Sequence, residues 1–363
     1  MASKKVLLAV GALSGGGAER VASLWASMLQ EQGFDVSMLI ISHVADEYAV
    51  AEGVKIYPVA ASVEAFLQIP YWKRILRMRA ILKQVRPDVL IPFLPTSQIY
   101  MMLASAGLGI RRIETIRISP WEVRLNPLRY ALWRWCYRSA WRIILQTAEQ
   151  ASFFSTNEQR KSVVIPNPLS PQIVANDKET QAERVTRFIA AGRIDPQKNY
   201  PMMIDGFAAV AAEYPELQLR IFGTGPSEYV EQIQQHIERR KMQGHIQLMG
   251  RTPQIEEEYK ESDVFLMTSD FEGSPNALIE AMASRLVCIS TACKTGPRDL
   301  ITSGENGFLI PVGGVDALAA TMRQVLAMDS ASRSTMAEAA RARVLEMCSE
   351  EQSLRRLCDT LQS

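Results

Sequence analysis

Residues 270–280, DFEGSPNALIE, follow the apolar run Asp263–Thr268, which is typical of a β-strand. The four residues after Glu272 predict a tight turn, and residues 277–283 predict a helix. The first amides of such a helix lack partners inside it, so together with the positive end of the helix dipole they attract phosphate. Glu272 in the turn and Glu280 in the helix can each accept a hydrogen bond from a hydroxyl group. A diphosphate with a sugar on each side, as in a nucleotide sugar, has this layout. The alternative is an ordinary β–turn–α unit with two surface glutamates.

The composition indicates a globular protein of two domains without a metal site. The chain has 363 residues, which exceeds one ordinary core, and 47% hydrophobic and 22% charged residues are typical of soluble proteins. No apolar run approaches the ~20 residues of a membrane-spanning helix, and the N-terminal MASKKVLLAVGAL predicts a first strand rather than a signal peptide. The five cysteines lack metal-ligand spacing and predict reduced thiols in the cytosol, and the three histidines form no triad or zinc site.

Charge is divided unevenly along the chain. Through residue 170 there are 20 Lys and Arg against 12 Asp and Glu, which leaves 20 against 27 in the remainder. The first half is therefore basic and the second acidic, and we expect the two halves to meet different partners.

Alternating strand and helix patterns predict two doubly wound α/β domains. In the first domain, residues 1–168, a strand leads into a glycine-rich turn, residues 11–20, which is neither the G-x-G-x-x-G dinucleotide fingerprint nor a P-loop. A polar linker, residues 167–183, precedes the second domain, residues 184–340. Residues 341–363 predict a C-terminal helix, for which packing back on the first domain is one option.

An ordered set of motifs gives the chain a resemblance to a known family. The motifs are Gly15-Gly16-Gly17-Ala18-Glu19-Arg20, Gly192-Arg193 with Lys198-Asn199, Gly223-x-Gly225-Pro226, Met249-Gly250 and Glu272-Gly273-Ser274-Pro275-Asn276-x-x-x-Glu280. Each motif alone is weakly specific, but their order and spacing resemble the retaining glycosyltransferases of family 4. The resemblance runs from about residue 11 to residue 310. It implies the GT-B fold, in which two Rossmann-like doubly wound domains face each other across a cleft and the second holds most of the nucleotide.

The resemblance assigns the reacting end of the donor to three side chains that would act in catalysis. Arg193 and Lys198 would meet the donor diphosphate, and Glu272 would hold the sugar. Two cations also stabilise the charge of a departing nucleoside diphosphate, so we expect neither a metal ion nor another cofactor; no D-x-D-type motif stands near these loops. Glu280 would accept bonds from the ribose hydroxyls. The donor-binding set implied by the resemblance is Gly16, Gly17, Arg193, Lys198, Gly223, Arg251, Glu272, Gly273, Ser274, Asn276, Ala277, Leu278 and Glu280.

The sequence departs from the family at one place in the first domain. Many members have a histidine there near the reacting sugar, whereas residues 114–120 contain none. Catalysis in the family is described as a same-face displacement in which the leaving phosphate takes the acceptor proton, a scheme that needs no protein base. Arg117 is expected to face the acceptor instead.

Basic and aromatic residues of the first half predict the acceptor side. Residues 71–86 predict a helix with six Lys and Arg and no acid, and residues 126–143 place Arg134, Arg138 and Arg142 on one predicted helix face among aromatic residues. Such a surface suits an anionic membrane or a lipid-linked pyrophosphate. The alternative is a solvated basic face with its tryptophans in the core. No nucleic-acid partner is expected, because charge alone carries no base readout. The expected acceptor-binding set is Gly15, Arg20, Lys73, Arg77 and Arg117.

These observations predict a cytoplasmic glycosyltransferase that associates peripherally with the anionic inner face of the plasma membrane. We expect it to move a hexose or N-acetylhexosamine from a UDP-linked nucleotide sugar to a polyprenyl-diphosphate-linked glycan, with retention and an α-linkage. O-antigen, capsule and protein-glycan assembly are the expected settings. The alternatives are a family 4 enzyme with a soluble acceptor and a non-catalytic GT-B binding module.

Overall fold

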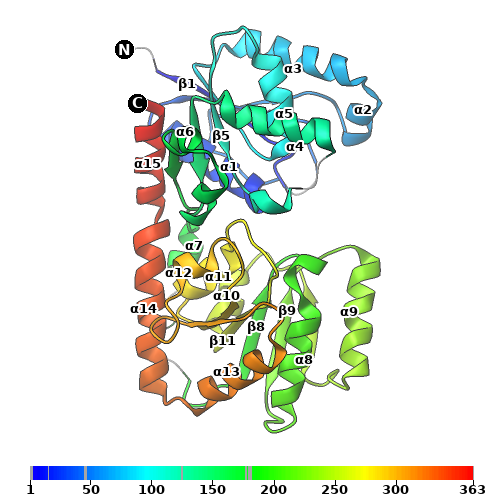
Figure 1. Ribbon diagram of the computed structural model, residues 1–363, viewed down its shortest axis with the longest axis vertical. Helices are drawn as coiled ribbons and strands as arrows, with labels where there is room; N and C mark the ends of the chain where they lie inside the picture. Colours follow the sequence, from blue (N-terminus) through cyan, green and yellow to red (C-terminus); the bar gives the residue numbers. More distant parts are fainter. Residues whose placement is uncertain are drawn as a thin grey trace. The chain divides into compact units, whose positions relative to one another are not determined.

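A computed structural model describes residues 3–14, 16–44, 47–123, 126–175, 178 and 182–362. The chain divides into two compact units. The first unit comprises Met1–Asn167 and Glu351–Ser363, and the second comprises Pro168–Glu350. Each unit is a parallel sheet covered by helices, so the predicted doubly wound α/β architecture is confirmed (Figure 1).

The sheet of the first unit has seven parallel strands in the order β3-β2-β1-β4-β5-β6-β7. Its central strands are apolar throughout because both of their faces are covered. Strand β1 lies between β2 and β4, where Val6 pairs with Val36 and Val89. The strand order therefore reverses direction between β1 and β4. Doubly wound sheets bind ligands at such a point, beside the carboxyl ends of the strands. The strands are β1 (Lys5–Ala9), β2 (Asp35–Ile40), β3 (Lys55–Pro58), β4 (Val89–Pro92), β5 (Arg111–Thr115), β6 (Arg142–Leu145) and β7 (Ser162–Val164).

Helices cover both faces of this sheet, and the alternation of side chains along β1 decides which helix packs where. Val6 and Leu8 pack with α1 and α15, whereas Leu7 and Ala9 pack with α2, α3 and α4. The helical segments of the first unit are α1 (Gly17–Glu31), α2 (Val63–Gln68), α3 (Tyr71–Val85), α4 (Pro95–Ser105), η1 (Pro120–Glu122), α5 (Pro127–Arg138), η2 (Glu149–Phe153), α6 (Thr156–Gln159) and α15 (Glu350–Gln362).

The sheet of the second unit has six parallel strands in the order β10-β9-β8-β11-β12-β13. Strand β11 lies between β8 and β12, where Val264 pairs with Phe188 and Val287. This pairing places the loops that follow β8 and β11 next to each other. The strands are β8 (Arg187–Ala191), β9 (Gln218–Phe222), β10 (Ile246–Gly250), β11 (Val264–Met267), β12 (Val287–Thr291) and β13 (Phe308–Ile310).

Two helical layers enclose this second sheet. Phe188 packs into a core with helices α8, α9 and α13, whereas its neighbour Ile189 packs on the opposite face with α11 and α14. The helical segments are α7 (Pro171–Ala175), η3 (Pro196–Lys198), α8 (Tyr200–Ala211), α9 (Ser227–Arg239), α10 (Ile255–Lys260), α11 (Asn276–Ala283), α12 (Pro297–Leu300), α13 (Val315–Ala327) and α14 (Ser330–Cys348).

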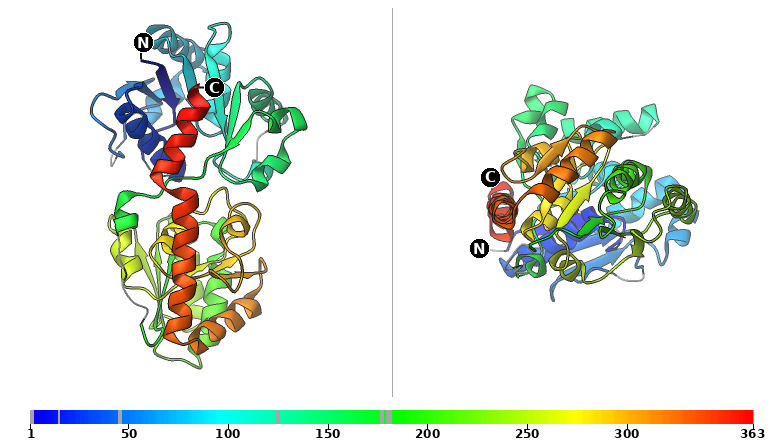
Figure 2. Two further views of the ribbon diagram at one scale, coloured as in Figure 1. Left: turned by 90° about the vertical axis from the view of Figure 1, so that its left-hand side faces the viewer. Right: turned by 90° about the horizontal axis from the view of Figure 1, so that it is seen from below.

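The last helix of the chain belongs to the first unit. Leu357 and Leu361 of α15 are fully buried in the core around Trp25, and Ser353 Oγ donates to the carbonyl of Pro166 at 2.9 Å. Figure 2 shows this helix, in red, beside the dark-blue first strand. The preceding helix α14 packs against α11 and stays in the second unit.

Two expectations that were drawn from the sequence patterns differ from the structure. The stretch read as a polar linker contains the short helix α7, whose Ile173 is buried. The prediction that Arg134, Arg138 and Arg142 share one helix face is wrong. Helix α5 ends at Arg138, and Arg142 is the first residue of β6, because the chain must turn after Ser139 to enter the sheet.

Candidate active site

Two loops of the second unit meet at the carboxyl ends of the neighbouring strands β8 and β11. The amide of Asp270 donates to the carbonyl of Gln197 at 2.9 Å, and Thr268 Oγ1 donates to the carbonyl of Lys198 at 2.9 Å. Asn199 Nδ2 also donates to the Asp270 carboxylate at 2.8 Å. These bonds between loops fix the positions of the predicted donor-binding residues that the loops carry.

A buried ion pair joins the two loops. Lys198 Nζ lies 2.6 Å from Glu272 Oε1, and the two side chains are only 16% and 5% exposed. The same carboxylate oxygen accepts a 2.6 Å hydrogen bond from Ser269 Oγ, and the Glu272 carbonyl accepts one from Thr295 Oγ1. Charge-assisted bonds of this kind are strong, and removing one partner leaves a buried charge uncompensated. The structure therefore brings together two of the three side chains that were predicted to act in catalysis.

Glycines allow the loop after β9 to run against the loop after β8. A Cβ atom on Gly223 would overlap the carbonyl of Gly192, and one on Gly225 would overlap the carbonyl of Ile194. The amide of Gly223 also donates to the carbonyl of Gly250 at 2.8 Å, which ties in the end of β10. Gly223 is thus required by backbone packing, whatever it does for a ligand.

Helix α11 begins beside this pair. Its N-cap is Pro275, whose side chain supplies no hydrogen bond to the helix amides, and the proline ring fills the space that a Cβ on Gly296 would need. Gly273 and Leu278 are buried, whereas Ser274, Asn276, Ala277 and Glu280 are half-buried. The first turn of α11 thus follows Glu272 closely along the chain and offers main-chain N–H groups at the end of a helix dipole.

The other predicted donor residues lie elsewhere. The Arg193 side chain is 68% exposed, with Nη2 3.4 Å from the Asp195 carboxylate, and Arg251 is exposed just after β10. Gly16 and Gly17 are the N-cap and the first residue of α1 in the first unit. The second unit therefore pairs Lys198 with Glu272 but leaves both arginines facing solvent.

Three hydroxyl residues of this site were missed by the sequence reasoning. Thr268 and Ser269 follow β11 directly, and Thr295 follows β12 after a short loop. Hydroxyl residues immediately after a buried apolar strand were the available signal, because the carboxyl ends of parallel strands meet at one edge. Thr295 carried no such signal, since only the fold brings it to the Glu272 carbonyl.

Arg117 is the most unusual residue of the predicted acceptor set. It follows β5 by two residues and is buried, with its guanidinium carbon 4.3 Å from the ring centroid of Trp25 and 4.8 Å from that of Phe93. Nη1 donates to Asn167 Oδ1 at 2.8 Å, and the same oxygen accepts from Gln146 Nε2 at 2.9 Å. Burial lowers the pKa of Arg117 to about 9.

The remaining predicted acceptor residues are more exposed. Gly15 lies outside the described residues, and Arg20 is half-buried on α1. Lys73 is exposed, with Nζ 5.3 Å from the centroid of the Trp72 ring. Arg77 is exposed as well, and its Nη1 donates at 3.4 Å to the main-chain carbonyl just after β3.

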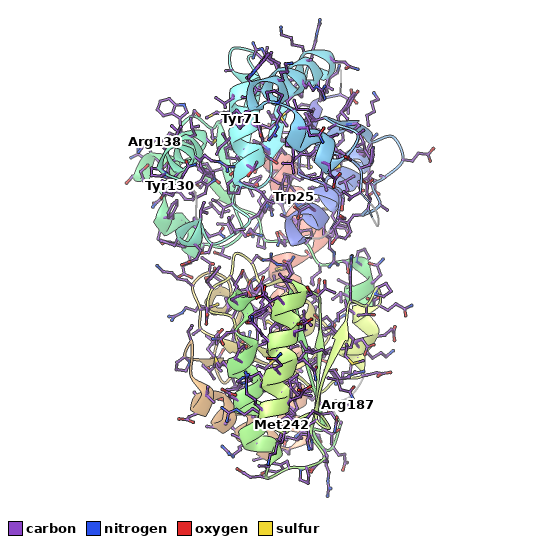
Figure 3. All side chains as sticks on the ribbon, turned by 90° about the vertical axis from the view of Figure 1, so that its right-hand side faces the viewer. Trp25, Tyr71, Tyr130, Arg138, Arg187 and Met242 are labelled. Carbon is purple, nitrogen blue, oxygen red and sulfur yellow. The ribbon has the colours of Figure 1, made fainter. Side chains whose placement is uncertain are left out.

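Large apolar side chains are exposed mainly on three helices of the first unit. Tyr71 of α3 stacks on Tyr100 of α4 with a centroid distance of 4.9 Å, and Arg129 of α5 donates to Thr96 of α4 at 3.3 Å, so these helices are neighbours. Figure 3 shows Tyr71 and Tyr130 on one side of this unit. Of the eleven large hydrophobic residues that are exposed in the described part of the chain, eight lie on α2, α3 and α5. We call these eight, with the arginines and lysines of the same helices, the aromatic–basic face: Val63, Leu67, Tyr71, Trp72, Leu76, Leu128, Tyr130 and Trp135.

The aromatic residues of α5 divide between core and surface. Trp133 and Tyr137 are fully buried, and both donate to Gln98 Oε1, at 2.8 Å and 3.0 Å. Trp135 is 57% exposed. The alternative of core tryptophans beside a solvated basic face therefore holds for Trp133 but not for Trp135.

None of the helices in the described part of the chain combines the length and the apolar character that crossing a membrane requires. Within the same residues, His, Cys, Asp and Glu form no group of three or more that could hold a metal ion.

Two family models match the chain one after the other. The model for Glycosyltransferase Family 4 matches residues 15–172, and the model for Glycosyl transferases group 1 matches residues 174–343. Among curated proteins, the amylovoran biosynthesis glycosyltransferase AmsD of Erwinia amylovora is 24% identical over 346 residues, which cover 93% of each chain. The Campylobacter jejuni GalNAc-α-(1→4)-GalNAc-α-(1→3)-diNAcBac-PP-undecaprenol α-1,4-N-acetyl-D-galactosaminyltransferase is 26% identical over 337 residues, which cover 89% of each chain.

Solved structures share the fold over nearly the whole chain. A mutant of S. aureus TarM in complex with fondaparinux, alpha-GlcNAc-glycerol and UDP superposes with a TM-score of 0.82 at 13% identity, covering 99% of this chain and 100% of that one. Anabaena Alr3699/HepE in complex with UDP and glucose superposes with a TM-score of 0.80 at 17% identity, with the same coverage.

Proposed function

Because the chain belongs to the family 4 glycosyltransferases of the GT-B fold, we propose that it transfers one sugar from a UDP-linked donor to a polyprenyl-diphosphate-linked glycan. The sugar is a hexose or an N-acetylhexosamine, and the new linkage is α, with retention of configuration. The setting is the assembly of an O-antigen, a capsule or a protein-linked glycan.

The buried Lys198–Glu272 pair carries this proposal. The Lys198 ammonium group is held 2.6 Å from the Glu272 carboxylate, which stands four residues before the start of α11 at the carboxyl edge of the sheet. A donor diphosphate at this place would meet a cation that is already positioned, together with the amides of the first turn of α11. Glu272 would then be free to accept a bond from a sugar hydroxyl.

The chemistry needs charge stabilisation more than a protein base. The bond between the anomeric carbon and the donor phosphate oxygen breaks, and the acceptor oxygen bonds to the same carbon from the same face. The acceptor proton goes to the leaving phosphate oxygen, so atoms and charge balance. Lys198, with Arg193 from the exposed loop, stabilises the departing diphosphate, and we propose that no divalent cation is required.

The aromatic–basic face supports the lipid-linked acceptor and a peripheral position on the membrane. Exposed indole and phenol rings beside arginines suit the headgroup region of a bilayer that contains anionic lipid. Trp72 and Leu76 are 59% and 54% exposed on the same helix as Lys73 and Arg77. The relative from C. jejuni is named for an undecaprenol-diphosphate acceptor, which is the same class.

Donor binding and hydrolysis across a panel of UDP- and GDP-sugars test the proposal. We expect one UDP-sugar to raise the melting temperature and to be hydrolysed, faster with a polyprenyl-diphosphate glycan and unchanged by EDTA. Glu272→Ala and Arg193→Ala should abolish turnover, whereas Arg323→Ala, which removes exposed bonds to Glu213 and to the carbonyl of Ala209, should not. A folded protein that binds none of the nucleotide sugars, or whose role survives Glu272→Ala, is instead a binding module.

A further inference from the structure

Among the buried cationic side chains of the described residues, Arg117 is the one with two nitrogens that lack a hydrogen-bond partner. Arg112 donates to Ser139 Oγ at 2.6 Å, and Lys178 lies 3.9 Å from the Asp263 carboxylate. Arg333 donates to three main-chain carbonyls. Arg117 donates to a single side-chain amide and, within the described residues, has no carboxylate within ion-pair distance. The four buried cationic side chains in the part of the chain that the structure describes are Arg112, Arg117, Lys178 and Arg333.

The two nitrogens of Arg117 that lack partners are Nε and Nη2. These are the nitrogens that present two parallel N–H groups along one edge of a guanidinium, the arrangement that binds a carboxylate or phosphate in a bidentate manner. The third nitrogen, Nη1, is fixed by Asn167, and the flat faces of the group lie against Trp25 and Phe93. The side chain is therefore held in place with its bidentate edge unused.

The unpartnered edge of Arg117 lies near the carboxyl ends of the strands, where doubly wound sheets bind ligands. Phe93, Gln146 and Asn167 each lie just past the carboxyl end of a strand, β4, β6 or β7. Gln146 Oε1 and Ser119 Oγ, two further buried polar atoms of this region, also have no partner. Unpaired polar atoms are rare in protein interiors, and a group of them at the carboxyl edge of a doubly wound sheet indicates a ligand.

We propose that Arg117 recognises an oxyanion, a carboxylate or a phosphate group, on the substrate that the first unit binds. The inference rests on the proposed function, since it narrows the acceptor-side substrate to molecules that carry such a group close to the reacting hydroxyl. A neutral hydroxyl could accept one of the two N–H groups, but it would leave the buried charge uncompensated. Both nitrogens are shielded from water, so the incoming group must displace neighbouring side chains to reach them.

Binding of simple probes to the full chain tests this proposal. Methyl α-D-glucuronide and inorganic pyrophosphate supply the two oxyanions, and methyl α-D-glucoside is the neutral match of the first. Pyrophosphate is measured in the double variant Arg193→Ala with Lys198→Met, which removes both predicted donor-side cations. We expect one oxyanion probe to bind at least tenfold more tightly than the neutral glucoside. Preference for the glucuronide identifies an acidic sugar, and preference for pyrophosphate identifies the diphosphate of a lipid-linked acceptor.

Substitution of Arg117 separates recognition from a structural role. Arg117→Met should abolish the preference for the oxyanion and should melt at the same temperature as the wild type or higher, because it removes an uncompensated charge. Arg117→Lys should retain part of the preference, since it keeps the charge but loses the bidentate edge. Arg333→Met is the matched control, and it should melt at a lower temperature because it orphans three carbonyls.

Two outcomes would overturn the proposal. One is equal binding of charged and neutral probes by the wild type. The other is an Arg117→Met variant that melts well below the wild type, as Arg333→Met does, while it keeps the preference. The binding of UDP-sugars, followed in parallel, decides the proposed function separately, because it depends on Lys198 and Glu272 in the second unit.

Discussion

Lys198 in the second unit is a half-buried cation and Arg117 in the first is a buried one, both near the carboxyl edge of a parallel sheet, yet only Lys198 lies beside a carboxylate. Lys198 lies 2.6 Å from a carboxylate that a serine also holds, whereas Arg117 has one amide partner at 2.8 Å. The cation of the second unit is thus paired within the protein, and that of the first is not. Under the proposals above, the difference means that the donor side is preorganised and that the acceptor side is completed by its substrate.

The same contrast appears in the net charge of the two halves. Residues 1–170 have 20 cations against 12 anions, and the rest of the chain has 20 against 27. A net positive charge on the first half would attract the anionic acceptors and lipids proposed above. The two halves have equal numbers of cations, so the acidity of the second half comes from its larger number of carboxylates.

The largest effect is expected from breaking the pair in the second unit. Lys198→Met should lower the turnover of the donor by about 10²–10³-fold, because one preorganised charge is lost from the departing diphosphate. It should also destabilise the unit by about 3 kcal/mol, since Glu272 is left as a buried anion. Steady-state kinetics and denaturant unfolding measure the two losses.

A double variant controls for this prediction. Lys198→Met combined with Glu272→Gln should recover most of the stability and none of the turnover. If the single variant unfolds like the wild type, the pair is not buried as described and the contrast with Arg117 fails.

The next effect concerns the packing of the two glycine-rich turns. Gly225→Ala should destabilise the second unit by about 1–3 kcal/mol, because the new Cβ overlaps the carbonyl of Ile194. Gly11→Ala in the first unit meets nothing within 4 Å and should change stability by less than about 0.5 kcal/mol. Thermal unfolding of both variants checks the comparison, and equal losses would refute it.

A smaller effect is expected at the surface of the first unit. Trp72→Ser with Leu76→Ser should weaken binding to vesicles that contain phosphatidylglycerol by roughly thirtyfold, since each exposed side chain loses about 1 kcal/mol of burial in the bilayer. Val312→Ser, at a site 45% exposed in the second unit, is the matched control and should bind like the wild type. Sedimentation with vesicles measures the loss of binding, and equal binding by all variants would contradict the proposed membrane association.

The last effect is a pH dependence of stability that arises in the first unit. Burial raises the pKa of Glu114 from 4.5 to about 8, although Arg112 and Lys161 oppose the shift. The folded chain keeps a proton that the unfolded chain releases, so stability should fall as the pH rises from 4.5 to about 8, by at most about 1.4 kcal/mol per pH unit. Glu114→Gln should flatten this slope in unfolding curves recorded across that range, and an unchanged slope would assign it to other groups.

The site of the second unit was easier to predict from the sequence, because each of its two charged residues lies in a short motif of its own. Glu272 lies in a strand–turn–helix motif, and the partner cation Lys198 stands in a motif of its own after an adjacent strand. The periodicity of strands and helices was enough to predict two doubly wound sheets. Adjacent parallel strands then bring the two motifs together without further information.

The acceptor side could not be predicted to the same depth, because its properties arise from tertiary packing. The position of Arg117 after β5 was visible, but its burial depends on Trp25 and Phe93, and its single partner is Asn167. The aromatic periodicity of α5 likewise did not predict that Trp133 would be buried, because Gln98, the buried hydrogen-bond partner of Trp133, comes from another helix. Side chains from distant segments leave no local pattern.

The position of α15 has a consequence for how the protein is made. Leu357 and Leu361 close the core around Trp25, so the unit whose residues leave the ribosome first is the last to be completed. During synthesis, part of the apolar face of the first sheet stays uncovered until the entire second unit has been translated. A nascent chain that stops within the second unit would expose this face, which gives cellular quality control a simple mark of unfinished product.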